Sequence, residues 1–148
     1  MCSSDLLARE LAVQKLIVAL IRGGLVESAH DCSEGGLAIT LAECTFNSGG
    51  IGVTADLAEA QAASGFSANA TLFGESASRI VVSAAGDRLD AVLAAAKSAG
   101  VTATVIGKTG GDRIRLSVGG TAVVDAAIGD AEQAWATAIE RRMSGNVR

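Results

Sequence analysis

Apolar residues recur at helical spacing in the first part of the chain. Within residues 6–22 the apolar positions of one stripe are Leu6, Val13, Leu16, Ile17, Leu20 and Ile21. Charged and polar residues separate them, which places the apolar side chains on one face of a helix. Gly23 and Gly24 follow and are typical of a helix end. The pattern predicts an amphipathic helix over residues 6–22.

Shorter apolar runs bounded by glycine and polar residues follow, as is typical of strands. The predicted strands span residues 26–30, 51–55, 79–84, 101–107, 113–118 and 122–125. Helices are predicted over residues 35–46 and 87–98, and residues 56–69 are predicted as a loop with room for a helical turn. Gly110 and Gly111 predict a hairpin turn into the strand at residues 113–118. The first strand, residues 26–30, is expected to be buried.

The end of the chain predicts a last helix that runs to Arg142. Asp130 and Gln133, three residues apart, form a capping box at its start. Trp135 is the only tryptophan and is expected to anchor this helix against the sheet. Strands separated by helices indicate an α+β or mixed α/β domain rather than a helical bundle. A length of 148 residues with 49% hydrophobic residues fits one domain.

The charge of the chain argues against binding to nucleic acid or to an anionic membrane. The formal net charge is −4 and the isoelectric point is about 4.9, whereas such binders present a basic surface to phosphates. The basic residues group modestly at Lys108, Arg113, Arg115, Arg141 and Arg142. They are interpreted as solvated strand edges and as a helix C-terminal turn, where cations suit the helix dipole.

Cysteine spacing and hydropathy limit the cellular setting. Cys2, Cys32 and Cys44 are odd in number and lack the paired spacing of a zinc site, so we expect neither a disulfide framework nor a metal cluster. The apolar run at residues 16–21 is much shorter than the roughly 20 residues of a membrane span. No basic segment of a secretory signal is visible at the start. We therefore expect a cytoplasmic protein.

Residues 28–38, Ser-Ala-His-Asp-Cys-Ser-Glu-Gly-Gly-Leu-Ala, are the most informative segment. A predicted strand ends at Asp31, Ser33 is placed to cap a helix, and Gly35 and Gly36 open that helix without side chains. Backbone N–H groups at such a helix start favour an anion, phosphate in particular. The alternative is an ordinary strand-to-helix turn whose glycines serve close packing.

Single residues of this segment also leave alternatives open. Asp31 either holds a metal-bound phosphate or bonds the N–H of Ser33 or Glu34 in an Asx turn. Glu34 is expected to stabilise the helix start by its charge. His30 and Cys32 are spaced to share one face, as in a thiolate–imidazole pair, but no third catalytic group accompanies them. The alternative is a buried histidine satisfied by backbone, beside a small apolar cysteine.

A second segment, residues 72–79, reads Leu-Phe-Gly-Glu-Ser-Ala-Ser-Arg and runs directly into an apolar strand. Glu75 and Arg79 are placed to clamp the turn between them. Alternatively, Ser76 or Arg79 lines a cleft between domains and faces a phosphate, which the planar guanidinium of arginine suits.

Together the two segments are similar to the C-terminal domain of phosphoribosylformylglycinamidine synthase of the large-subunit type. That family carries A-H-D-x-S-(E/D)-G-G-L-A, matched here by residues 29–38, and L-F-(G/S)-E-S-x-x-R, matched by residues 72–79. The likeness covers residues 6–135. It implies a three-layer α/β/α domain with a mixed central sheet over residues 6–148, preceded by a leader at residues 1–5, as one part of a larger enzyme.

The resemblance also implies a function. Such enzymes convert formylglycinamide ribonucleotide, ATP and glutamine-derived ammonia to the amidine in purine synthesis. ATP and Mg²⁺ serve the full enzyme, and we expect neither to bind stably to this chain, which is expected to be inactive alone. The implied partners are the N-terminal domains of the same enzyme, a glutaminase and small accessory subunits. The implied phosphate or nucleotide cleft holds Asp31, Ser33, Glu34, Gly35, Gly36, Ser76 and Arg79, with no catalytic residue and no metal ligand assigned.

Two other functions stay open at this point. The C-terminal domains of aminoimidazole ribonucleotide synthetase and of selenophosphate synthetase-like enzymes share this fold and a glycine-rich helix start, although residues 73–76 speak against them. A stand-alone anion-binding or interaction module is the alternative from another class. It predicts affinity for phosphate or nucleotide that Gly36→Val abolishes.

Overall fold

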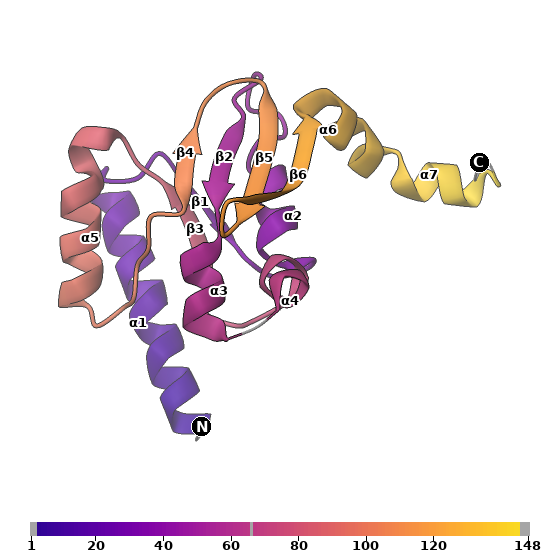
Figure 1. The fold of residues 1–148 in the computed structure, drawn as a ribbon. Helices are drawn as coiled ribbons and strands as arrows, with labels where there is room; N and C mark the ends of the chain where they lie inside the picture. The colour runs from indigo at the N-terminus through magenta and orange to yellow at the C-terminus, as the bar shows by residue number, and fades with distance from the viewer. Residues whose placement is uncertain (1–2, 66, 146–148) are drawn as a thin grey trace.

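The computed structural model describes residues 3–65 and 67–145, arranged as helices around two sheets (Figure 1). The helices are α1 (Ser3–Arg22), α2 (Gly36–Glu43), α3 (Ala58–Ser64), α4 (Ala68–Phe73), α5 (Leu89–Ser98), α6 (Ile128–Ala136) and α7 (Ala138–Met143), with a 3₁₀ turn η1 (Gly86–Arg88). The strands are β1 (Ser28–Asp31), β2 (Val53–Asp56), β3 (Ile80–Ser83), β4 (Gly107–Thr109), β5 (Arg113–Val118) and β6 (Thr121–Ala127). The predicted leader at residues 1–5 lies partly outside the described residues, and Ser3 already begins α1.

The larger sheet is mixed and has the strand order β4-β2-β5-β6. β2 and β5 are parallel, whereas β2–β4 and β5–β6 are antiparallel. The smaller sheet pairs β1 with β3 in antiparallel register, Ser28 opposite Ser83 and Asp31 opposite Ile80. Helices around a mixed sheet confirm the predicted mixed α/β fold class.

The main core lies between α2 and the four-stranded sheet. Leu37 and Leu41 of α2 pack in one cluster with Ile114 and Leu116 of β5. We call this cluster the sheet core; α4 and α6 contribute Leu72 and Ile128 to it. β5 alternates buried and more exposed residues, as expected of a strand with one covered face. The strand predicted at residues 113–118 is therefore confirmed as β5.

A second, smaller cluster joins α1 to α5. It consists of Leu16 and Leu20 from α1 with Val92 and Ala96 from α5, and we call it the α1–α5 cluster. Figure 1 shows the two helices side by side at one edge of the molecule. The predicted helix at residues 6–22 is confirmed, and its buried face includes Val13 as well.

Three predicted elements are wrong in type. Residues 101–106 are not a strand, and only Gly107–Thr109 pairs, as β4. Residues 56–69, predicted as a loop, contain all of α3 and the start of α4, because their alanine-rich sequence favours helix. The predicted hairpin at Gly110 and Gly111 does not pair its flanking strands, since β2 lies between β4 and β5. Instead, Gly110 donates to the carbonyl of Gly52, whose own N–H donates to Gly111.

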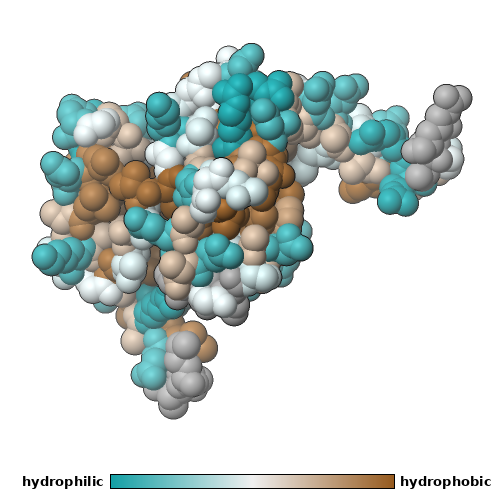
Figure 2. All heavy atoms as spheres, viewed as in Figure 1, coloured by the Kyte–Doolittle hydropathy of each residue, from teal (hydrophilic) through white to brown (hydrophobic). Residues whose placement is uncertain are grey.

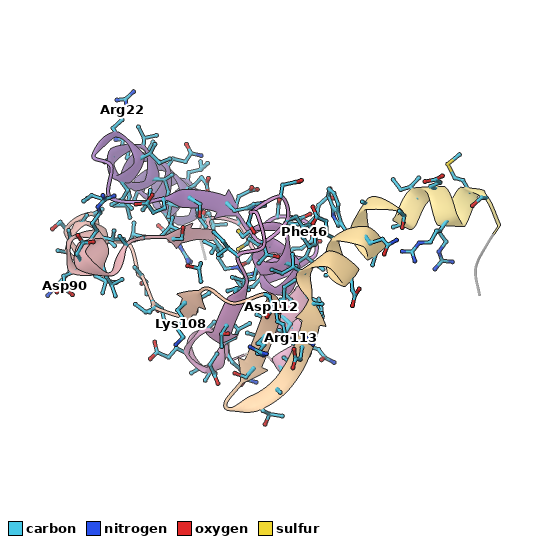
Figure 3. The ribbon with its side chains drawn as sticks, turned by 90° about the horizontal axis from the view of Figure 1, so that it is seen from above. Arg22, Phe46, Asp90, Lys108, Asp112 and Arg113 are labelled. Carbon is cyan, nitrogen blue, oxygen red and sulfur yellow. The ribbon has the colours of Figure 1, made fainter. Side chains whose placement is uncertain are left out.

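The C-terminal helix also departs from the prediction. It is divided at Thr137, and α6 begins after Ala127 without a side-chain cap, so Asp130 and Gln133 form no capping box. Trp135 does not anchor on the sheet. Its indole N–H donates to Glu43 Oε1 at 3.1 Å, and its ring centroid lies 5.6 Å from that of Phe46. Phe46, labelled in Figure 3, follows the end of α2. α6 and α7 extend away from the sheet (Figure 1).

Hydrophobic and hydrophilic residues occupy different parts of the surface. Figure 2 shows hydrophobic residues across the middle of this face, from α5 to the four-stranded sheet, and hydrophilic residues at the upper end of the sheet. β1, predicted as buried, is mostly exposed, because its only described strand neighbour is the four-residue β3. Within residues 3–65 and 67–145, no helix combines the length and apolar character needed to cross a membrane.

Candidate functional site

The first motif forms a strand-to-helix turn, with the helix starting one residue later than predicted. Gly35 is the N-cap of α2, with φ at 76° and no side-chain cap bond, so Ser33 does not cap this helix. Gly36 follows at φ 68°. Both angles lie in the left-handed region, where glycine is favoured over residues with a side chain.

The glycines have a packing reason as well as a conformational one. A Cβ on Gly36 would stand 2.7 Å from the carbonyl carbon of Phe73 and 2.9 Å from the carbonyl oxygen of Leu72. A Cβ on Gly35 would stand 2.6 Å from Cγ1 of Ile39 in the same helix. Close packing against the end of α4 therefore accounts for glycine at position 36 without a ligand.

The two motifs meet through a hydrogen bond. The backbone N–H of Gly35 donates to Glu75 Oε1 at 3.2 Å, which joins the start of α2 to the loop between α4 and β3. Arg79 Nη2 donates to the carbonyl of Gly74 at 2.7 Å. The predicted clamp of this loop therefore differs in its partners: Arg79 holds the Gly74 carbonyl, and Glu75 holds Gly35. Among the residues that the structure describes, the buried Nε of Arg79 has no hydrogen-bond partner.

A surface hollow of about 530 Å³ lies between the two motifs. Of the residues that the sequence assigned to a cleft, Asp31, Ser33, Glu34, Ser76 and Arg79 line it. Gly35 and Gly36 do not line this hollow. The structure thus brings side chains from both motifs to one place, although 40 residues separate Gly35 from Glu75.

Two charged residues that line the hollow were missed as site residues by the sequence analysis. Glu10 of α1 and Glu75 both line the hollow. Glu10 Oε2 accepts a hydrogen bond from Ser78 Oγ, and Gln14 donates to its Oε1 at 2.8 Å. These two bonds, Ser78 first, hold the pKa of the Glu10 carboxyl below its ordinary value. Because Glu10 lies 68 residues before Ser78, local sequence carried no signal for it, whereas Glu75 belongs to the second motif.

The charges around the hollow are mostly negative. Glu10, Asp31, Glu34 and Glu75 line it as carboxylates, and Arg79 is the cation among the lining residues. The arginine is turned toward the Gly74 carbonyl. Carboxylate oxygens suit a hard cation such as Mg²⁺, but within the described part of the chain no three His, Cys, Asp or Glu side chains are placed to hold a metal ion.

His30 and Cys32 belong to different environments. Cys32 is buried in the sheet core, 4% exposed. His30 is not fully buried; its Nδ1 lies 2.8 Å from the Asp31 carbonyl oxygen and its Nε2 lies 3.8 Å from Glu43 Oε2. The backbone-satisfied histidine beside an apolar cysteine describes the site better than a thiolate–imidazole pair. The Asp31 carboxylate itself is 69% exposed.

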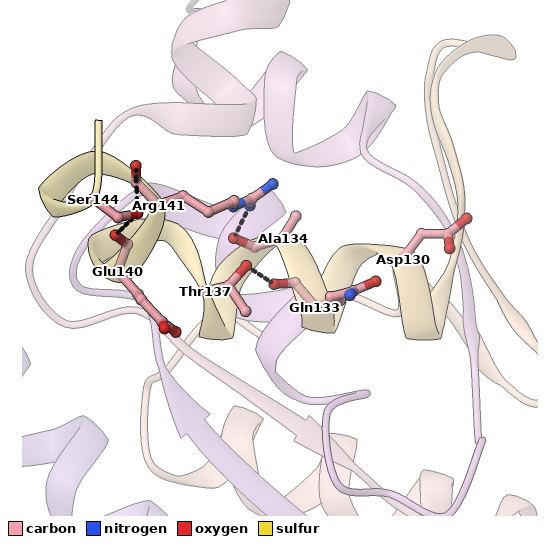
Figure 4. Close-up of a pocket in the computed structure, with 7 residues that line it drawn as sticks. All are labelled: Asp130, Gln133, Ala134, Thr137, Glu140, Arg141 and Ser144. Atoms are coloured by element: carbon pink, nitrogen blue, oxygen red, sulfur yellow. Dashed lines mark hydrogen bonds between the residues drawn. The ribbon is translucent and has the colours of Figure 1, made fainter. Parts of the chain in front are cut away.

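A second hollow, of about 470 Å³, lies along α6 and α7 (Figure 4). The side chains that line it bond to helix carbonyls: Thr137 Oγ1 donates to Gln133 at 2.7 Å, and Arg141 Nη2 donates to Ala134 at 2.8 Å. These bonds satisfy carbonyl groups at the division between the two helices. We therefore regard this hollow as a structural feature of that division.

Comparison with known proteins identifies relatives over most of the chain. Residues 4–119 match the family described as AIR synthase related protein, C-terminal domain. The chain is 39% identical over 133 residues to the phosphoribosylformylglycinamidine synthase subunit PurL of Moorella thermoacetica, covering 90% of this chain and 17% of the relative. It is 45% identical over 123 residues to PurL of Salinibacter ruber, covering 81% of this chain and 15% of the relative. The chain thus spans about a sixth of the length of these curated relatives.

Solved structures show the same fold. T. maritima PurL complexed with FGAR aligns with a TM-score of 0.72 at 19% identity, covering 83% of this chain and 21% of that one. T. maritima PurL complexed with ATP aligns with a TM-score of 0.70 at 17% identity, covering 82% and 21%. At this identity the likeness concerns the fold.

Proposed function

The chain belongs to the AIR synthase related protein C-terminal domain family, and on that premise we propose that it is a C-terminal domain of a phosphoribosylformylglycinamidine synthase. The relatives described above carry that name rather than those of aminoimidazole ribonucleotide synthetase or selenophosphate synthetase. Because the chain spans about a sixth of those relatives, we assign the activity to a larger protein of which this domain is one part.

The observation that carries the proposal is the contact between the two motifs. Glu75 bonds Gly35, and the hollow beside this bond holds side chains from both segments. We propose that Asp31, Ser33, Glu34, Ser76 and Arg79 form one wall of a phosphate or nucleotide cleft, with Gly35 and Gly36 shaping the helix start behind it. A neighbouring domain supplies the opposite wall.

The proposed reaction is an ATP-dependent ligation. The amide oxygen of formylglycinamide ribonucleotide takes the terminal phosphoryl group of ATP, with ADP leaving. Ammonia then adds to the activated carbon and inorganic phosphate leaves, which yields the amidine. FGAR and ATP are named with the T. maritima structures, which supports these substrates. We assign this chain the shaping of the cleft and no catalytic residue.

Mg²⁺ is part of the proposal for the complete enzyme. We assign Asp31 a contribution to it, since its side chain is 69% exposed and lines the hollow at the end of β1. When bound, the ion would offset the charge of the phosphate oxygens. Magnesium commonly takes one or two carboxylates together with substrate phosphates, which is compatible with a contribution from Asp31.

We further propose that the partners are the N-terminal domains of the same enzyme, a glutaminase subunit and a small accessory subunit, and that the complex works in the cytoplasm. A structure named PurLQS from Thermotoga maritima supports an assembly of this kind. Neither nucleic acid nor membrane is among the proposed partners, in keeping with the net charge of −4.

A domain exchange tests the function. The matching segment of Moorella thermoacetica PurL is replaced by this chain, and ATP-dependent amidine formation is measured with ammonia as nitrogen donor. We expect the chimera to turn over and the isolated chain to be inactive. A folded chimera without activity, or turnover by the isolated chain, would contradict the proposal. A chimera that also carries Glu59→Gln, an exposed change on α3, is the control. It should be as active as the chimera itself.

A further inference from the structure

We propose that the outward face of α1 is a dimerisation surface, on which a second copy of this chain docks to form a parallel, two-stranded coiled coil. This face carries an apolar stripe of its own, on the side of the helix opposite to the stripe that α1 buries in its domain. The inference goes beyond the proposed function and does not rest on it.

Large apolar residues remain exposed along one side of α1. They are Leu7, Leu11, Val18 and Ile21, whose exposed fractions run from 46% to 71%. Together with Gln14 they follow one another by alternating steps of four and three residues, which is the spacing of the a and d positions of a coiled coil. Leu11 and Val18 then occupy a positions, and the other three occupy d positions. We call these five residues the α1 seam; it is about two heptads long.

The α1 seam is free to meet a partner while the domain stays intact. Val13, Leu16 and Leu20 are buried in the domain. In the heptad that the seam defines they fall at c and f positions, which lie outside the seam of a coiled coil. The N-terminal end of α1 also extends beyond the rest of the domain (Figure 1). Because the domain covers one side of α1, the helix has room for one partner helix on the other.

The charges beside the α1 seam fit a second copy of the same helix. Glu10 takes a g position, and Lys15 takes the e position of the following heptad. These two positions face each other across the seam of a parallel pair, so Glu10 would meet the partner subunit's Lys15. Two-fold symmetry forms the same pair a second time. Gln14 Nε2 donates to Glu10 Oε1 at 2.8 Å, which holds the carboxylate beside the seam.

An antiparallel pair would lack this attraction. In that arrangement e positions face e positions, and those of α1 include the cations Lys15 and Arg22, whose charges repel. Gln14 also favours the parallel pair in register, because its amide then faces the same amide of the partner and can both donate and accept. A shifted alignment would place this amide against apolar side chains, at a cost in free energy.

The length of the α1 seam predicts a weak dimer. Isolated helices of about two heptads are marginal in water. However, α1 is already folded by its packing against α5, and such preorganisation lowers the cost of ordering on association. We therefore expect a dissociation constant on the order of 10 µM, so the dimer forms in concentrated solution and separates on dilution.

Sedimentation equilibrium of the purified chain over a dilution series tests the dimer. The average mass should rise with concentration from the 14.7 kDa of one chain towards twice that value. Leu11→Lys puts a charge into the seam and is expected to raise the dissociation constant at least about tenfold. Leu6→Lys is the matched control, since Leu6 is 47% exposed against 51% for Leu11 but lies at a c position. Its effect should stay within about twofold.

Two charge reversals test the direction of the helices. Lys15→Glu places a carboxylate opposite the partner's Glu10 in a parallel pair, and we expect the dissociation constant to rise about fivefold. Arg22 faces the partner's Ile17 in the same pair, so Arg22→Glu should change it little. In an antiparallel pair both reversals would instead tighten the dimer, because each removes repulsion between cations.

A chain that stays monomeric at every concentration overturns the inference and leaves the α1 seam to a neighbouring domain of a larger protein. Equal weakening by Leu6→Lys and Leu11→Lys overturns it too, as does a Lys15→Glu dimer no weaker than the parent. Circular dichroism verifies that each variant is folded; if Leu11→Lys is not, Val18→Lys at the next a position decides. The domain exchange measures turnover rather than mass, so the two proposals fail separately.

Discussion

At Gly36 the backbones of two helices approach too closely for any side chain between them. A Cβ at this position would lie 2.9 Å from the Gly74 carbonyl oxygen, and φ is 68°. Gly36→Ala is expected to lower the free energy of unfolding by about 3 kcal/mol, combining left-handed strain with overpacking. Urea denaturation measures the change.

Gly24→Ala is the matched control for that substitution. Gly24 has a similar φ of 62°, but nothing lies within 4 Å of its Cβ position. The backbone strain alone should lower stability by about 1 kcal/mol. Equal losses at Gly24 and Gly36 would contradict the close packing of α2 against α4.

Asp56 predicts a pH dependence of stability. Its carboxylate accepts hydrogen bonds from the N–H of Ala58, the hydroxyl of Ser117 and the N–H groups of Gly120 and Gly119, and these lower its pKa. A lowered folded-state pKa gives stability that is present at neutral pH and declines as the pH falls below the unfolded value of about 4.

Thermal unfolding of Asp56→Asn between neutral and acidic pH tests this expectation. The parent chain should be more stable than the variant at neutral pH, and the difference should shrink as the Asp56 carboxyl is protonated. Asp90→Asn, an exposed change on α5, serves as the control. A difference that grows on acidification would contradict the assigned role of the carboxylate.

Residue-level reasoning predicted which side chains lie near one another better than it predicted their contacts. Side chains of both motifs, Asp31 and Arg79 among them, were expected at one place and do line one hollow. Ser33 was given a capping role that Gly35 fills, because the chain enters α2 in a left-handed conformation. Glu10 could not be foreseen as a neighbour, since its contact with Ser78 depends on how α1 packs in three dimensions.

At the scale of elements, α7 should contribute little to stability. It has no buried residue among those described, and it extends from the molecule beyond α6 (Figure 1). Ending the chain after Thr137 is expected to change the free energy of unfolding by less than about 0.5 kcal/mol, as for a surface change. Urea denaturation of the shortened chain measures it.

Ending the chain after Ala127 is the companion experiment. It also removes α6, whose Ile128 is 7% exposed and belongs to the sheet core. A loss of about 2 kcal/mol or more is expected from that side chain alone. If the shorter and longer truncations were equally stable, α6 would not be part of the core.

Elements with a strong apolar period were predicted well, and elements set by distant partners were not. α1 and β5 carry their own pattern and were placed correctly. Residues 101–106 are as rich in β-branched residues as a strand, yet they form no strand in the described structure. Only their last residue bonds to β2, where the Asp56 N–H donates to the Ile106 carbonyl at 2.8 Å, and regular pairing with β2 begins at β4. Pairing is a tertiary property, so propensity alone misassigned this segment.

At the scale of the whole molecule, two clusters of unequal size predict unequal stability. The α1–α5 cluster is smaller than the sheet core, and regions with few buried contacts open first. In hydrogen exchange, the amides of α1 and α5 should exchange faster than those of β2 and β5. Uniform protection of these four elements would contradict this prediction.

Two core substitutions sharpen the exchange experiment. Leu20→Ala, at a residue 2% exposed in the α1–α5 cluster, should accelerate exchange chiefly in α1 and α5. Leu116→Ala, equally buried in the sheet core, should accelerate exchange throughout the described elements. Both substitutions are Leu→Ala at equally buried residues. A different pattern of exchange in the two variants therefore shows that the two clusters open separately.

The position of Trp135 has a spectroscopic consequence. It is the only tryptophan in the chain, it is 57% exposed, and it rests on Glu43 and Phe46 at the end of α2. Intrinsic tryptophan fluorescence therefore reports the release of α6 from α2. It does not report directly on the sheet core or on the α1–α5 cluster, since neither contains a tryptophan. Unfolding followed by tryptophan emission should have an earlier midpoint than unfolding followed by far-ultraviolet circular dichroism. Taking the emission midpoint as that of the whole domain would therefore underestimate the stability of the domain.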